Sequence, residues 1–331
     1  MEQMKNILYG TPDNPEVDDD RAKDLSKAIQ AEGLLIITLE HLEEIPFEAR
    51  KDSALIFSNL VRKNIYNFAQ YIEANPRIIT LLCEGYSKSE SALNCGSILR
   101  ECIRHGNLAK ILIDSDCLWK FFDTYVHLPN FDVASDAFST LHDVLITEKN
   151  KAIASEFLIE KYDEVVKHYN ALLHSENYVT RRRSLKLLGE LLLDRSNFTV
   201  MMKYISSKHN LKLIMNLLRD KSPNIQFEAF HVFKVFVANP KKTVDISSIL
   251  YKNKAKLVPF LETFQSDKDV GGFNDEKNLL IQTLSSLEKP LETANSTSSG
   301  TNNNNIVPNT ISQSVQLEAI NKLSIDDSND K

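Results

Sequence analysis

The chain has 331 residues with only 9 glycines and 10 prolines, and its formal net charge is −6. So few turn-forming residues leave little room for the many chain reversals of a β-sandwich or barrel. The negative charge argues against a general nucleic-acid binder, which normally presents a basic face, although it leaves room for a local basic patch.

The N-terminal part of the chain shows neither a targeting signal nor a membrane-spanning segment. It opens Met1-Glu2-Gln3-Met4-Lys5, unlike a signal peptide. The apolar run from Leu34 to Leu39 is far shorter than the roughly 18 residues of a membrane span. The four cysteines are too sparse for a disulfide framework, and only Cys102 with His105 forms a close pair of zinc-ligand types. We therefore expect a reducing compartment, the cytoplasm or the nucleus.

A repeated helical pattern runs through the middle of the chain. Each copy is anchored on a small residue, and the anchors are spaced 38, 45, 47 and 45 residues apart. Apolar or small residues recur four and seven positions after each anchor, which places them on one face of an α-helix. The residue one position after the anchor widens that face in the repeats where the residue eight positions after the anchor is also apolar. The anchors are Ala54, Ala92, Ala137, Ser184 and Ala229.

Helix-start signals agree with this pattern. Ser222-Pro223 is an N-cap followed by the proline that suits the first helical position. Ser87 with Glu90 predicts a capping box before the second repeat helix, and Asn130 precedes the third. Shorter apolar-periodic segments lie between the long helices, over 107–113, 118–126 and 211–218. A period of about 40–47 residues with two or three helices per unit is typical of armadillo and HEAT repeats. The alternative is a non-repetitive helical bundle.

The end of the chain changes composition after Lys289-Pro290. It becomes rich in asparagine and serine, including Asn302 to Asn305. Such sequence cannot bury enough apolar area to offset the entropy cost of ordering it. We therefore expect an all-α protein with an armadillo/HEAT-like repeat domain over residues 1–290, a right-handed superhelical solenoid, followed by a disordered tail over 291–331.

The sequence offers little for chemistry. No glycine-rich phosphate loop and no zinc-protease motif is present, and no nucleophile and base are placed together. The segment from Asp267 to Asp275 has acids at positions 1, 3 and 9 of an EF-hand loop, but Gly271 and Asn278 stand where ligands are required. We therefore expect no enzyme activity, no cofactor and no metal site.

A basic cluster opens the fourth repeat helix: Arg181, Arg182 and Arg183 with Lys186. At 100° per residue some of these side chains must face away from the core. Two interpretations remain open. The cluster is either a solvated helix face or an anchor for an acidic or phosphorylated partner, since guanidinium groups pair with carboxylates bidentately.

Several strings resemble one known family. They are Ala92-Leu93-Asn94-Cys95-Gly96, Leu99-Arg100-Glu101-Cys102-Ile103-Arg104-His105, Leu173-His174-Ser175-Glu176-Asn177-Tyr178-Val179-Thr180, and the stretches 184–195 and 224–240. They are similar to the calcium-binding-protein-39-like family, also called Mo-twenty-five. The resemblance runs from about Met4 to Pro290. Two departures stand out: an N-terminal helix of the family is expected to be missing, and the Asn/Ser-rich tail is additional.

The resemblance implies a function. Family members are non-catalytic armadillo/HEAT-like scaffolds that bind protein kinases of the germinal-centre (sterile-twenty-like) class and related pseudokinases. Their concave face holds the kinase in its closed, active conformation. A separate pocket binds a Trp-Glu-Phe peptide at the C-terminus of the pseudokinase.

The resemblance also implies site residues. Tyr178, Arg182, Phe198 and Phe131 match contacts of the concave face, and Met215 matches the peptide pocket. On pattern alone Phe198 and Met215 would be assigned to the core.

We therefore expect a cytoplasmic kinase-activating scaffold that is monomeric on its own and binds neither nucleic acid nor membrane. A general armadillo adaptor for transport or cytoskeletal partners, without effect on kinase activity, is the alternative.

Overall fold

The computed structural model describes residues 1–11, 16–265 and 272–290, and the predicted tail lies outside these ranges. The described residues form 18 α-helices and four short 3-10 helices. The all-α class predicted from the sequence is therefore confirmed. The chain divides into two compact units, Met1–Ser184 and Leu185–Lys331. The single repeat domain expected over residues 1–290 stays a prediction.

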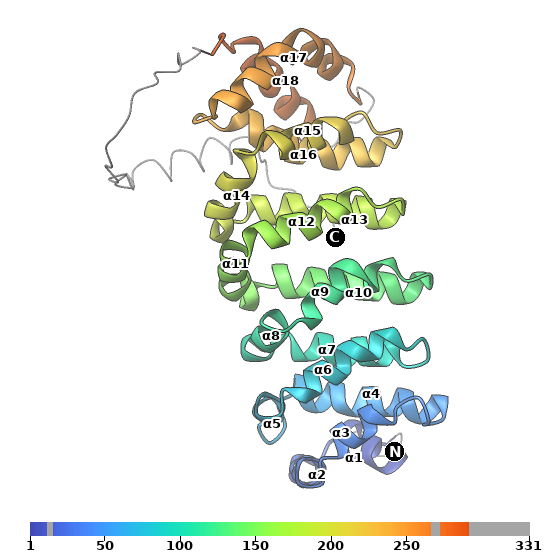
Figure 1. Cartoon of the computed structure of the whole chain (residues 1–331). Coiled ribbons are helices and arrows are strands. Elements are labelled where there is room, and N and C mark those ends of the chain that lie inside the picture. The colour runs from blue at the N-terminus through green and yellow to red at the C-terminus, as the bar shows by residue number, and fades with distance from the viewer. Residues whose placement is uncertain (12–15, 266–271, 291–331) are drawn as a thin grey trace, which may run out of the picture. The chain divides into compact units, whose positions relative to one another are not determined.

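The first unit contains the first three copies of the repeat. Its long helices α4, α7 and α10 follow one another in a stack, with α7 packed against both α4 and α10 (Figure 1). The helices are α1 (Glu2–Tyr9), α2 (Asp19–Ala31), α3 (Leu34–Glu40), α4 (Phe47–Arg62), α5 (Phe68–Ala74), α6 (Arg77–Glu84), α7 (Ala92–Cys102), α8 (Gly106–Ile113), α9 (Cys117–Asp123), α10 (Phe131–Ile146), α11 (Lys151–Glu160), α12 (Tyr162–Leu173) and α13 (Tyr178–Leu193), with 3-10 helices η1 (Gly85–Ser87), η2 (Tyr125–His127) and η3 (Glu148–Asn150).

The second unit begins within α13 and holds the last repeat helix, α16. Phe230 on α16 contacts Phe264 and Phe273, with ring centroids 5.7 and 4.9 Å apart. Lys234 on α16 pairs with Glu276 on α18 at 2.9 Å, and both side chains are buried. The helices are α14 (Phe198–Ile205), α15 (Lys208–Leu217), α16 (Pro223–Ala238), α17 (Val244–Thr263) and α18 (Phe273–Ser285), with 3-10 helix η4 (Arg195–Asn197).

The repeat register predicted from the sequence is confirmed by burial. All five anchors are buried, as are the residues four and seven positions after them. The residue one position after the anchor follows the predicted rule. In two repeats the residue eight positions after the anchor is an arginine, Arg62 or Arg100. In these repeats Leu55 and Leu93, one position after the anchor, are 41% and 47% exposed. Where the residue eight positions after the anchor is apolar, the side chain one position after the anchor is at most 3% exposed, as for Phe138, Leu185 and Phe230.

Two of the three predicted N-caps are confirmed, and one is wrong. The Asn130 side chain accepts from the amides of Asp132 and Val133, and Ser222 accepts from the amide of Ile225. Ser87 does not cap α7, because it belongs to η1 and the helix begins at Ala92. Tertiary contacts fix the residues before α7 instead. Tyr86 is buried against Phe121 and Tyr125, and Glu90 pairs with Arg50.

The four cysteines are free thiols and all are buried. Burial raises the pKa of Cys95 to about 12 and raises the pKa of Cys102 further. Cys95 and Cys102 are therefore core residues, as their spacing on one helix face predicted.

Candidate protein-binding surface

Two aromatic side chains are exposed at the starts of α10 and α13, the long helices of two successive repeats. Phe131 opens α10 and is 62% exposed, and Tyr178 opens α13 and is 39% exposed. Each follows an asparagine that caps the helix: Asn130 before α10, and Asn177, whose Oδ1 accepts from the amides of Val179 and Thr180. The cap fixes the first turn, so both rings are presented to solvent from a rigid helix end.

A small pocket lies between the start of α13 and α10. It is lined by Phe131, Ser135 and Phe138 of α10 and by Asn177, Thr180 and Arg183 on the other side. The structure thus brings Phe131 beside the start of α13, although 47 residues separate it from Tyr178. This juxtaposition depends on how two successive repeats pack.

The three consecutive arginines have three different environments. Arg181 donates from Nη1 to the carbonyl of Ser175 at 2.8 Å. Arg182 is exposed, one turn after Tyr178 on the same side of α13. Arg183 is half-buried and reaches back to α10. Arg182 is therefore the most exposed of the three arginines.

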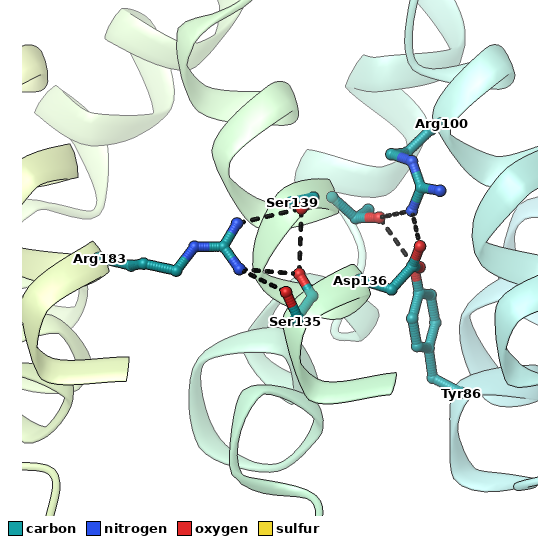
Figure 2. A network of polar contacts seen from close by, with 7 residues as sticks. Tyr86, Arg100, Ser135, Asp136, Ser139 and Arg183 are labelled. Carbon is teal, nitrogen blue, oxygen red and sulfur yellow. Dashed lines mark hydrogen bonds and ion pairs between the residues drawn. The ribbon is translucent and has the colours of Figure 1, made fainter. Parts of the chain in front are cut away.

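The Arg183 side chain is held by the preceding repeat (Figure 2). Its Nη1 donates to the carbonyl oxygen and the hydroxyl of Ser135, both at 3.0 Å, and its Nη2 donates to the Ser139 hydroxyl at 3.1 Å. The guanidinium also lies 4.4 Å from the centroid of the Phe138 ring. Four contacts therefore fix this arginine against α10.

A second polar network lies on the other side of α10 (Figure 2). The Arg100 guanidinium pairs with the Asp136 carboxylate, and the Tyr86 hydroxyl donates to Asp136 at 2.6 Å. The Tyr86 and Thr140 hydroxyls lie 2.8 Å apart. Burial alone would lower the pKa of Arg100, but the hydrogen bond and charge of Asp136 outweigh it, so this pKa lies above its ordinary value. Burial, then Asp136, raises the pKa of Tyr86 well above its usual range.

These inter-repeat contacts were missed by sequence reasoning. The repeat pattern could have indicated them, because Asp136 and Arg183 both occupy the position just before a repeat anchor. In both cases that residue contacts the long helix of the preceding repeat, α7 for Asp136 and α10 for Arg183. Sequence alone gives no means of choosing which polar residue on that helix is the partner.

The remaining predicted site residues belong to the second unit. Phe198 begins α14 and is half-buried, just after Asn197, whose amide donates to the Leu191 carbonyl at 3.0 Å. Met215 on α15 is also half-buried. It lines a pocket of about 210 Å³ together with Leu218, Arg219, Asn253, Lys256, Leu257 and Phe260. Neither residue is fully enclosed in the core, which differs from the assignment made from pattern alone.

In the described part of the chain, no three histidine, cysteine, aspartate or glutamate side chains are grouped so that they could hold a metal ion. Asp267 and Asp269 of the EF-hand-like segment lie outside the described residues. Within the same described ranges, no helix is both long and apolar enough to cross a bilayer.

Comparison with known proteins gives a consistent result. A family model described as Mo25-like matches residues 1–288. The chain is similar to Calcium-binding protein 39-like of Mus musculus, with 50% identity over 293 residues that cover 87% of this chain and 86% of the relative. It is 46% identical over 291 residues to the Mo25-like protein of Schizosaccharomyces pombe, covering 87% of each. It is 46% identical over 287 residues to MO25-like protein 2 of Caenorhabditis elegans, covering 86% and 84%.

Proposed function

Because the chain belongs to the Mo25-like family, we propose that it is a non-catalytic scaffold that binds and activates a protein kinase of the germinal-centre (sterile-twenty-like) class or a related pseudokinase. The observation that carries the proposal is the exposed pair Tyr178 and Arg182 beside the exposed Phe131, all on helix ends held by side-chain caps. Aromatic residues and arginine are the types most enriched in binding hot spots. The proposed place of action is the cytoplasm.

The proposed mechanism is a population shift. A kinase domain exchanges between open and closed conformations, and a scaffold favours the closed one only if it binds that conformation more tightly. A rigid surface suits this task, because little ordering entropy is lost on binding. The packing of α13 against α10 through Arg183 supplies such rigidity in the first unit.

A second contact is proposed at the pocket of about 210 Å³ around Met215. Met215, Leu257 and Phe260 provide apolar surface, while Arg219 and Lys256 provide positive charge at the same pocket. This combination suits a peptide that alternates aromatic and acidic residues, such as a C-terminal Trp-Glu-Phe sequence, and the family resemblance points to the same ligand.

The decisive experiment is a kinase assay with purified germinal-centre-class kinase domains, with and without this protein. We expect binding and a rise in kinase activity. Arg182→Ala should weaken kinase binding about thirtyfold, about 2 kcal/mol, as for a central hot spot. Its thermal stability should change by less than about 0.5 kcal/mol, because the side chain is exposed.

The matched control is Lys167→Ala, which removes one positive charge from an exposed position of α12 in the same unit. It should leave both binding and activation unchanged. Kinase binding without activation would favour the general adaptor. Equal losses for Arg182→Ala and Lys167→Ala would show a diffuse electrostatic effect rather than a single anchor.

The peptide pocket is tested separately with a fluorescent peptide that ends in Trp-Glu-Phe. Met215→Ala should weaken its binding at least fivefold, because the apolar contact is lost, whereas Lys167→Ala should not change it. Unchanged binding in Met215→Ala would place the peptide elsewhere.

A further inference from the structure

Two arginines contact α10 from opposite sides, and only one of them meets a carboxylate (Figure 2). Arg100 pairs with Asp136. Arg183 bonds only to neutral groups among the described residues, namely Ser135, Ser139 and the Phe138 ring. A half-buried guanidinium thus holds its charge between two hydroxyls and an aromatic ring.

Among the described residues, no carboxylate forms a direct ion pair with Arg183. Burial lowers the pKa of its guanidinium, and the charge of the Asp143 carboxylate offsets this only in part. The group nevertheless stays protonated at neutral pH, because a guanidinium does not lose its proton in proteins. Removing it partly from water without an anionic partner has a desolvation cost that an incoming anion would offset.

Arg183 is also prepared for binding. Its three hydrogen bonds engage at most three of the five N–H groups, so at least two remain for a ligand. Because the bonds to α10 already fix the side chain, little rotamer entropy is lost when a ligand pairs with it. The guanidinium lines the same small pocket as Phe131, which is 62% exposed, so the two residues border one candidate binding place.

We propose that Arg183 is a carboxylate-binding site, which takes an aspartate or glutamate side chain of a protein partner whose adjacent aromatic residue packs on Phe131. The single positive charge matches a carboxylate. A phosphoryl group carries about two negative charges and is usually bound by several arginines. The proposal rests on the proposed function for the identity of the partner, and it names the chemistry that the partner must bring.

The first test uses a small probe and the full chain, without a kinase. The Nε–H resonance of Arg183, assigned by its loss in Arg183→Gln, is followed by NMR during titration with N-acetyl-Glu-Phe-amide. We expect a saturable shift with this peptide and none with N-acetyl-Gln-Phe-amide. No shift, or equal shifts with both peptides, would overturn the site. A tighter interaction with N-acetyl-phosphoserine-Phe-amide would overturn the assignment to a carboxylate.

The second test uses whichever kinase domain binds the wild-type protein. Arg183→Gln keeps a donor for Ser135 but removes the charge, and we expect about tenfold weaker binding, about 1.4 kcal/mol. Arg183→Lys, which keeps the charge but not the fork, should lose less. Lys167→Gln, the same change of charge at an exposed position of α12, should lose nothing. Equal affinity for Arg183→Gln and wild type would refute the role of Arg183 in the complex.

The two tests separate the two proposals. If the wild-type chain binds no germinal-centre-class kinase domain, the proposed function fails, while the peptide titration still decides the Arg183 site. If Arg183→Gln lowers the melting temperature, two other measurements still decide whether Arg183 binds a carboxylate. They are the comparison of Arg183→Lys with wild type and the peptide titration of the wild-type chain.

Discussion

Replacing Gly96 by alanine should destabilise the first unit, although alanine favours a helix. Gly96 lies on α7 directly against the polar network of Asp136 and Tyr86. A Cβ added there would lie 2.1 Å from Asp136 Oδ2 and 2.5 Å from the Tyr86 hydroxyl oxygen. Both atoms belong to side chains, and the Tyr86 ring is buried against Phe121 and Tyr125. Relieving the overlap therefore disrupts the hydrogen-bonded positions of Asp136 and Tyr86.

The expected magnitude follows from the bonds that are lost. A hydrogen bond to a charged group contributes about 1.5–3 kcal/mol, and Asp136 makes two such contacts, with Tyr86 and with Arg100. Alanine recovers about 1 kcal/mol of helix propensity relative to glycine. The difference predicts that Gly96→Ala lowers the free energy of unfolding by about 2–5 kcal/mol.

The assay is urea unfolding of the full chain followed by circular dichroism, with Gly189→Ala as the control. Gly189 on α13 is also helical, but the nearest atom to an added Cβ is Val232 Cγ2 at 3.8 Å, an ordinary contact. The control should therefore stabilise the protein by up to about 1 kcal/mol. If Gly96→Ala is as stable as Gly189→Ala, the reasoning about close packing against Asp136 is refuted. In an Asp136→Ala background the Gly96→Ala loss should become smaller, because the contact with Asp136 is removed while the one with Tyr86 remains.

Four further predictions concern other parts of the chain. Lys234→Met should destabilise the second unit by about 3–5 kcal/mol, because it leaves the buried Glu276 without its counter-ion, whereas Lys234→Met with Glu276→Leu should be close to wild type in urea unfolding. Burial lowers the pKa of Lys242 from 10.5 to about 8, so the folded state releases this proton before the unfolded state does. The stability of wild type relative to Lys242→Met should therefore rise between pH 8 and 10.5, and a flat or falling difference would contradict the assignment. Isothermal titration calorimetry should show no saturable calcium binding at micromolar concentrations; binding that Asp267→Ala abolishes would show that the loop is a calcium site. Truncation after Pro290 should leave the melting temperature and kinase activation unchanged, and a drop of several degrees would show that the tail packs on the folded part.

Much of the helical architecture could be predicted from local sequence. The anchors and the apolar residues four and seven positions after them are buried as expected. Leu55 and Leu93 are exposed because Arg62 and Arg100 interrupt the apolar face on the same side of their helices. Caps such as Asn130 and Ser222 act over two or three residues, so their side-chain hydrogen bonds follow from sequence.

The error at Ser87 shows where local reasoning stops. A capping box needs only a serine and a glutamate three residues apart, and the sequence provides both. Contacts with residues 35 to 40 positions away prevail instead, because Tyr86 is buried against Phe121 and Tyr125, and Glu90 pairs with Arg50. Burial of a large aromatic side chain outweighs the roughly 1 kcal/mol of a helix cap.

For the candidate site, too, the sequence predicts one part and only the tertiary structure decides the other. The cluster of Arg181, Arg182 and Arg183 could be read from the sequence, together with the rule that not all three can face the core. The structure separates them into a contact with the Ser175 carbonyl, an exposed side chain and a half-buried charge, and only the last depends on the packing of α13 on α10. A helical repeat specifies its own face through neighbours three and four residues apart. The partner of a side chain that crosses to the next repeat lies some 45 residues away, and only the register between the two helices decides which group it meets.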